Sequence, residues 1–118
     1  MISQKPYLIR AIYEWCEDNN FTPYLAVKVD DNTLVPKQYV QNDQIILNIS
    51  HDATKDILID NEWITFKATF GGNIRDIAVP VSNVLAAFAK ENGLGMQFKE
   101  DPEPPHTPAK TGGLKLVK

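Results

Sequence analysis

The amino-acid sequence predicts a small, mainly β domain with an N-terminal helix, a second short helix and a disordered C-terminal tail. Short runs rich in β-branched and aromatic residues fill the middle of the chain and are separated by turn-forming residues. Helical periodicity is confined to one segment near the N-terminus and one after residue 80. A chain of 118 residues is long enough for one domain with a modest core.

We expect the first helix to run from Pro6 to about Asn19. Proline suits the first helical turn, because the N–H that it lacks would have no intrahelical partner there. The apolar residues fill a wider arc than a single contact with a core requires. Either the helix is deeply buried, or its second side contacts a partner subunit. The residues that would make such a dimer contact are Tyr7, Leu8, Ala11, Ile12 and Trp15.

We expect strands at residues 24–29, 44–50, 57–59, 63–70, 73–79 and 94–98. Strand alternation places Ile64, Phe66, Ala68 and Phe70 on one face of the fourth of these. The glycine pair that follows is typical of a hairpin turn.

Residues 81–92 are expected to form the second helix, directly after Pro80. Ser82 would be its N-cap and Gly93 would end it. Leu85, Phe88 and Ala89 would then face the sheet.

The composition changes at residue 99. The segment KEDPEPPHTPAKTGG contains four prolines, two glycines and no large apolar residue, so we expect a disordered linker at 99–113. The segment LKLVK at 114–118 adds three apolar residues beyond that linker. It is either a frayed end or a short peptide held out for a partner. The chain therefore divides into a domain at 1–98, a linker at 99–113 and a terminal peptide at 114–118.

The charge distribution argues against nucleic acid and anionic lipid as partners. The net charge is −3, and residues 1–98 contain 12 acidic against 8 basic side chains. No apolar run approaches the roughly 18 residues of a membrane span, and the N-terminus does not have the pattern of a signal peptide. A single cysteine fits a reducing compartment, so we expect a cytoplasmic protein without membrane contact.

No group of residues in the sequence has the pattern of a catalytic or metal site. His51 and His106 have no Cys or His neighbours at metal-ligand spacing, and Cys16 is on an apolar helix that disfavours a thiolate. We expect no catalytic residue, metal or cofactor, and an enzyme is the least favoured class. Phe66, Lys67 and Phe70 could form a stacking platform, so the main alternative to a protein-binding module is an Sm-like RNA-binding module.

Five segments resemble the stringent starvation protein B (SspB) family. They are PYLIRAIYEWCEDNNFTPYLAV, DQIILNIS, ITFKATFGG, VPVSNVLAAFAKENGLGMQF and LKLVK, and the resemblance covers residues 5–98 and 114–118. It implies a homodimeric adaptor that binds ssrA-tagged proteins and delivers them to the ClpXP protease. It also implies a compact, curved antiparallel sheet or open barrel, Sm-like in form, with the first helix in the dimer contact.

The resemblance also implies two binding segments. The groove for the ssrA tag would be formed by Asn48, Ile49, Ser50, Phe66, Lys67, Ala68, Thr69, Phe70, Gly71 and Gly72. A small residue among large ones leaves room for a ligand, so Ala68 is the most informative position, unless it merely fits the core. The N-terminal zinc-binding domain of ClpX would bind Leu114, Lys115, Leu116, Val117 and Lys118. The linker between them is short and spans at most about 50 Å when extended.

Overall fold

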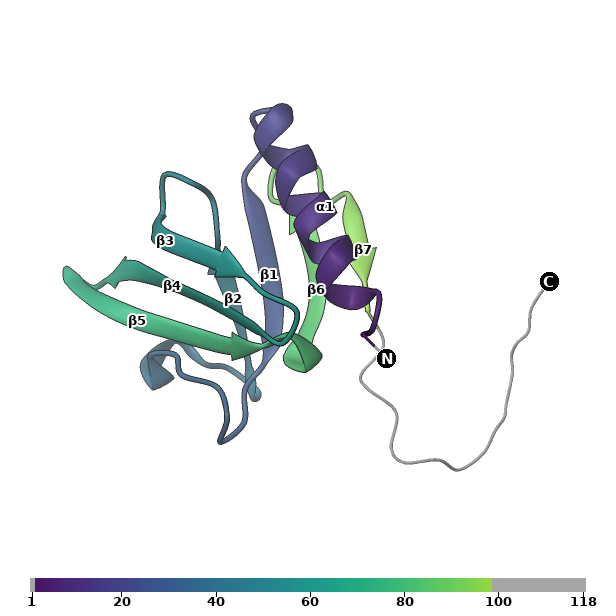
Figure 1. Ribbon diagram of the computed structural model, residues 1–118. Coiled ribbons are helices and arrows are strands. Elements are labelled where there is room, and N and C mark those ends of the chain that lie inside the picture. The colour runs from purple at the N-terminus through teal and green to yellow at the C-terminus, as the bar shows by residue number, and fades with distance from the viewer. Residues whose placement is uncertain (1, 99–118) are drawn as a thin grey trace, which may run out of the picture.

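The computed structural model describes residues 2–98, which form one α-helix (α1), two short 3₁₀ helices (η1 and η2) and seven strands (Figure 1). In chain order the elements are α1 (Lys5–Asp18), β1 (Pro23–Lys28), η1 (Lys37–Tyr39), β2 (Gln44–Asn48), β3 (Thr54–Ile59), β4 (Trp63–Phe70), β5 (Asn73–Pro80), η2 (Val81–Asn83), β6 (Val84–Ala89) and β7 (Gly95–Gln97). The mainly β class with an N-terminal helix is therefore confirmed. The expected linker at 99–113 and the terminal peptide at 114–118 lie outside the described residues.

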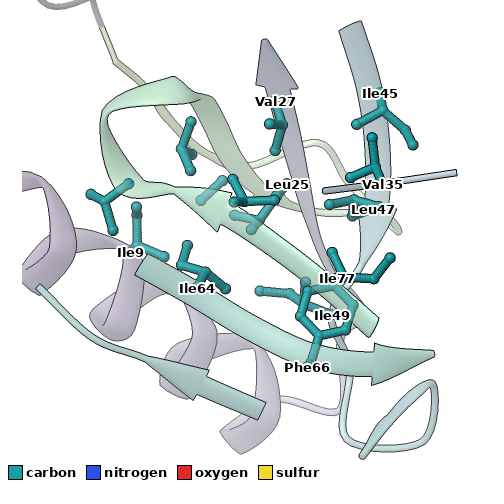
Figure 2. Close-up of a cluster of buried hydrophobic side chains, with 14 residues drawn as sticks. Ile9, Leu25, Val27, Val35, Ile45, Leu47, Ile49, Ile64, Phe66 and Ile77 are labelled. Carbon is teal, nitrogen blue, oxygen red and sulfur yellow. The ribbon is translucent and has the colours of Figure 1, made fainter. Parts of the chain in front are cut away.

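The strands form two antiparallel sheets, neither of which closes on itself. The larger has the order β2-β1-β6-β7, and the smaller has the order β3-β4-β5. Alternating apolar side chains from both sheets meet between them, as Figure 2 shows for Leu25, Leu47, Ile64, Phe66 and Ile77. The alternation along β2 is as predicted, because Ile45 and Leu47 are buried while their neighbours are exposed. The two sheets thus share one apolar core.

Helix α1 covers the end of this core beside β6 (Figure 1). Ile9 and Cys16 are fully buried, and the helix is tied to the β3–β4 turn by Arg10, which donates hydrogen bonds to the Ile59 carbonyl at 2.8 Å and to Asn61 Oδ1 at 3.0 Å. Of the residues expected at a dimer contact, four lie on the outer side of the helix or beside it: Tyr7 and Ala11 are exposed, and Leu8 and Trp15 are half-buried. The fifth, Ile12, is half-buried against the core.

The prediction of a helix over residues 81–92 is wrong. Only η2 is helical, as a single 3₁₀ turn, and the chain then continues as β6 between β1 and β7. The physical reason is a β-bulge: Val84 pairs with Val27 and Ala86 with Ala26, which leaves Leu85 as an extra residue. The buried positions therefore fall at Val84, Ala87 and Ala89, and the spacing of three at the bulge imitates a helix.

The hairpin of β4 and β5 agrees with the sequence prediction. The two strands pair without interruption from Trp63 and Pro80 to Phe70 and Asn73. Gly71 and Gly72 connect them with φ values of 57° and 85°, a conformation that glycine adopts without steric cost. This hairpin carries the residues that the sequence analysis assigned to a binding groove.

Candidate functional site

A hollow of about 530 Å³ opens beside the distal half of β4. It is formed by the loop before β3, the first residues of β3, the second half of β4 and the start of β5. Its lining residues are Asp52, Ala53, Thr54, Lys55, Asp56, Lys67, Ala68, Thr69 and Ile74. Ligand sites in proteins typically have volumes of about 300–1,000 Å³, so the hollow is large enough for part of a short peptide.

The hollow owes its shape to an irregular pairing between β3 and β4. Thr54 pairs with Ala68 and Lys55 with Lys67, but two residues of β3 then stand opposite the single residue Phe66. One of them, Asp56, has a φ of 57°, in the left-handed region that few non-glycine residues occupy. Bulges of this kind bend a strand and re-aim its side chains, and they are frequent next to binding sites.

Ala68 is at the centre of this arrangement. Its cross-strand neighbours are Thr54 on β3 and Arg75 on β5, and its methyl group packs against the edge of the core. On the same face of β4, Phe66 and Phe70 have large rings. A side chain that ends at Cβ leaves space on this face of the strand, whereas the side chains of Lys67 and Thr69 are on the other face. That a ligand uses this space stays a prediction.

The loop before β3 is held in place by its own hydrogen bonds. The Ser50 carbonyl accepts hydrogen bonds from the Ala53 N–H at 3.0 Å, the Thr54 N–H at 3.1 Å and the Thr54 hydroxyl at 2.9 Å. The Asn48 side chain accepts one from the Ser50 N–H at 2.9 Å, which is an Asx turn. The His51 N–H donates to Glu17 Oε2 at 3.3 Å and so connects the loop to α1. One wall of the hollow is therefore preformed, because these hydrogen bonds hold the loop in place without a ligand.

Both signs of charge surround the hollow. Lys55 and Lys67 are cross-strand neighbours, while Asp52 and Asp56 line the same space. The Lys67 ammonium lies 3.6 Å from an Asp76 carboxylate oxygen, and the two side chains are 47% and 75% exposed. Such exposed ion pairs contribute little free energy, so Lys67 could exchange Asp76 for a charged ligand at low cost.

The residues predicted for the groove fall into three sets in the structure. Lys67, Ala68 and Thr69 line the hollow. The side chains of Ile49 and Phe66 are buried in the core, with exposed fractions of 1% and 4%, so they support the site from beneath and are not available to a ligand. Asn48, Ser50, Phe70, Gly71 and Gly72 surround the site without lining the hollow.

At the hairpin tip, Phe70 packs on Tyr39, with ring centroids 5.3 Å apart. A Cβ on Gly71 would lie 3.3 Å from the Tyr39 hydroxyl oxygen. Ser50 borders a separate polar depression of about 330 Å³ together with Glu17 and His51. Because Phe66 is buried and its ring is on the opposite face of β4 from Lys67, the stacking platform considered for RNA is not formed.

The sequence analysis missed the contributions of residues 52–56 and Ile74. The position of this segment beside Ala68 depends on the bulged pairing of β3 with β4, which no local pattern shows. Ile74 carried a usable signal, because it is a large aliphatic residue directly after a Gly-Gly turn. Its side chain is 74% exposed at the rim of the hollow.

The environment of Cys16 disfavours nucleophilic chemistry. The thiol is fully buried, and desolvation raises its pKa, with smaller contributions from the negative charges of Glu91 and Glu17. A raised pKa leaves little reactive thiolate at neutral pH. Within residues 2–98, no three His, Cys, Asp or Glu side chains are grouped so as to hold a metal ion. In the same part of the chain, no helix is both long and apolar enough to cross a membrane.

The fold and the hollow define a small, mainly β protein of two open sheets, with an exposed cleft beside an edge strand. Residues 3–114 match the model of the family described as Stringent starvation protein B (SspB), and the chain belongs to this family.

A curated relative from Haemophilus influenzae, described as a stringent starvation protein B homolog, is 42% identical over 99 residues. The match covers 83% of this chain and 66% of the relative, so the chain spans just under two thirds of that relative's length. Neither description names an enzymatic activity.

Proposed function

We propose that this chain is a proteolysis adaptor that binds ssrA-tagged proteins and delivers them to the ClpXP protease. The observation that carries the proposal is the hollow beside Ala68, which is open, partly preformed and lined by residues 52–56, 67–69 and Ile74. Membership of the SspB family supports this reading. The role requires selective binding and no covalent chemistry, so we assign no catalytic residue and no cofactor. We place the activity in the cytoplasm.

The tag would bind as an extended peptide along the free edge of β3. This strand is at the edge of its sheet, so its outward backbone groups can hydrogen-bond an added strand. Side chains of the peptide could then enter the hollow over Ala68, where their burial would select among sequences. Lys55 and Lys67 would add charge-dependent selection at the rim.

Delivery would depend on tethering. We assign residues 114–118 to contact with the N-terminal zinc-binding domain of ClpX, with Leu114, Leu116 and Val117 supplying apolar contacts. A tag held by an adaptor that is itself bound to the unfoldase has a raised local concentration at the pore, so two weak contacts act together. No new chemistry is required for faster degradation.

The test is degradation of an ssrA-tagged reporter by ClpXP at a reporter concentration below the KM of the protease. The full chain should accelerate degradation, and a chain lacking residues 114–118 should not. Binding of a labelled ssrA peptide serves as the matched control, because the truncated chain keeps the whole described domain and should bind as tightly as the full chain. If the truncated chain accelerates degradation as well as the full chain does, the tethering mechanism is wrong.

We also propose a homodimer through the outer side of α1. Tyr7 is 52% exposed, Ala11 is also exposed, and Leu8 and Trp15 are half-buried, so the helix presents an apolar side to solvent. Ile12 packs against the core and would support this side from within. An aspartate at Ala11 would place an unpaired charge in that contact and should weaken the dimer by several kcal/mol, roughly the cost of burying a charge without a partner. Sedimentation velocity measures the change. A wild-type chain that is monomeric at micromolar concentration would refute the dimer.

A further inference from the structure

The two faces of the four-stranded sheet differ in how they are covered. One face holds the core residues Leu25, Leu47 and Val84, which pack under α1 and the smaller sheet. The opposite face contains a second hollow, of about 380 Å³, which is separate from the candidate tag site. Its lining residues are Ala26, Ala86, Phe88, Gly93, Gly95, Met96 and Gln97.

The floor of this second hollow consists of small residues. Ala26 on β1 pairs with Ala86 on β6, which in turn pairs with Gln97 on β7. Beside this row, the rings of Tyr24 and Phe88 meet edge to face, with centroids 5.9 Å apart. The surroundings are apolar as well, because Ile46, which pairs with Ala26, is 52% exposed. Aliphatic side chains would find both space and apolar contact here.

Strand β7 borders the second hollow and is at the edge of its sheet. Among the described strands it pairs only with β6, and all three of its residues are exposed. Gly95 lets β7 approach β6 closely, since a Cβ at this position would lie 2.1 Å from the Ala87 carbonyl oxygen. An edge strand beside an apolar hollow is the arrangement that binds an added strand by backbone hydrogen bonds and side-chain burial together.

We propose that residues 114–118 of this chain bind in the second hollow as an added strand beside β7. In an extended segment Leu114 and Leu116 point to one side and Val117 to the other, so the two leucines would enter the hollow together. The connection would continue the antiparallel succession of β6 and β7. This proposal concerns the described domain and its own C-terminal segment, and it holds or fails independently of any contact with ClpX.

The length of the intervening segment favours this occupant. The described chain leaves β7 at Phe98, and the 15 residues from 99 to 113 span at most about 50 Å extended and about 20 Å as a coil. Residues 114–118 can therefore return to the hollow beside β7. Between residues 99 and 118 the only large aliphatic side chains are Leu114, Leu116 and Val117. The terminal segment and the domain also differ in the sign of their charge. Lys115 and Lys118 are basic, and residues 1–98 contain 12 acidic against 8 basic side chains.

The consequence is a competition for the same residues. A segment bound beside β7 cannot simultaneously contact another protein through the same leucines. A tether of this length gives an effective concentration of about 1 mM, so even weak binding would keep the segment docked for part of the time. A partner with higher affinity would displace it.

The test uses the full chain with ¹⁵N-labelled glutamine and without tag or unfoldase. Gln97 pairs with Ala86 on the floor of the hollow, so its side-chain amide reports on the hollow, and the other four glutamines of the chain provide reference signals. Deletion of residues 114–118, or Leu116→Ser, should move the Gln97 side-chain amide resonance to a common undocked position. Val117→Ser is the matched control and should leave the resonance where the full chain has it. Free LKLVK peptide at about 1 mM should restore the docked position in the truncated chain.

Amide hydrogen exchange gives a second readout. If the tether holds the segment at about ten times its Kd, exchange of the outward-facing β7 amides should become about tenfold faster on truncation. Identical Gln97 signals in the full and truncated chains would overturn the proposal. A Gln97 signal that changes on about tenfold dilution would overturn it too, because the occupant would then be a second copy. Equal effects of Leu116→Ser and Val117→Ser would overturn the strand-like arrangement.

Discussion

The two halves of β4 have the same alternating sequence pattern but different surroundings. In the first half, Ile64 and Phe66 point into the core between the sheets, with exposed fractions of 0% and 4%. In the second half, Ala68 and Phe70 are on the same face but only partly buried, and the hollow opens beside Ala68. The first half therefore stabilises the fold, while the second half borders the hollow to which we assign ligand binding.

This difference shows that alternation determines the face of a strand but not its burial. Burial depends on what lies opposite, and the larger sheet covers only part of the β4–β5 hairpin, which extends beyond it in Figure 1. Near the free end, Arg75 and Ile74 are exposed on β5 opposite Ala68 and Thr69. Substitutions along one strand should therefore have separable effects on stability and on binding.

The largest effect on stability is expected for Phe66→Ala. Removal of a buried phenylalanine ring costs about 3–5 kcal/mol, because it removes apolar burial and leaves a cavity. Urea unfolding of the variant and of Thr69→Ala, an exposed position on the same strand, measures the contrast. A loss of less than about 1 kcal/mol for Phe66→Ala would show that this half of β4 is not the stabilising one.

A much smaller effect on stability is expected for the Lys67–Asp76 ion pair. A double-mutant cycle of Lys67→Gln and Asp76→Asn should give a coupling free energy of about 0–1 kcal/mol, since both side chains are largely exposed. The coupling should shrink further when salt is added. A coupling above about 2 kcal/mol would mean that the pair is a structural element of the hairpin and not a replaceable contact.

The smallest effect concerns acid stability and lies outside β4, at the contact between Thr22 and Glu91. Hydrogen bonds to the Glu91 carboxylate from the Thr22 N–H and hydroxyl, both 2.7 Å long, lower the pKa of this group below its ordinary value of 4.5. The folded state therefore binds this proton less readily than the unfolded state does. The stabilisation is present above pH 4.5 and is lost as the pH falls through the lowered pKa.

On acidification, the urea midpoint of the Glu91→Gln variant should therefore fall less than that of the wild type. The stability difference between Phe66→Ala and Thr69→Ala should be the same with or without Glu91→Gln. Asp30 has a pKa lowered in the same direction by hydrogen bonds from the Asn32 N–H and the Asn83 side chain, so some acid sensitivity should persist in the variant. An unchanged pH profile would mean that the Thr22 contact contributes nothing in solution.

Much of this organisation could be predicted from the sequence, because it is encoded locally. The β4 strand, the Gly-Gly turn and the helix that begins near Pro6 each follow from residue pattern and turn chemistry. The place of Ala68 beside a hollow also has a local signal, since a small residue interrupts large ones on one face; its role in binding stays a prediction.

The rest depends on contacts between distant segments. The prediction of a helix at 81–92 was wrong because of the bulge at Leu85. Buried residues along a strand normally recur every second position, but here they are three apart, which imitates a helix. The wall formed by residues 52–56 was missed for a related reason, because it depends on how β3 pairs with β4. The two β-bulges, at Leu85 and at Asp56, thus account for both misses.

The central claim is that the second half of β4 binds the ssrA tag at Ala68. The direct measurement is fluorescence anisotropy of a labelled ssrA peptide titrated with the wild-type chain, with Ala68→Gln and with Ala78→Gln. The last variant is the matched control, because Ala78 is half-buried on β5 and borders no part of the hollow. The wild type and Ala78→Gln should bind the tag and ignore a scrambled peptide. Ala68→Gln should lose at least about tenfold in affinity, or 1.4 kcal/mol, while unfolding at nearly the same urea concentration. Wild-type affinity in a folded Ala68→Gln chain would place the tag elsewhere and contradict the account.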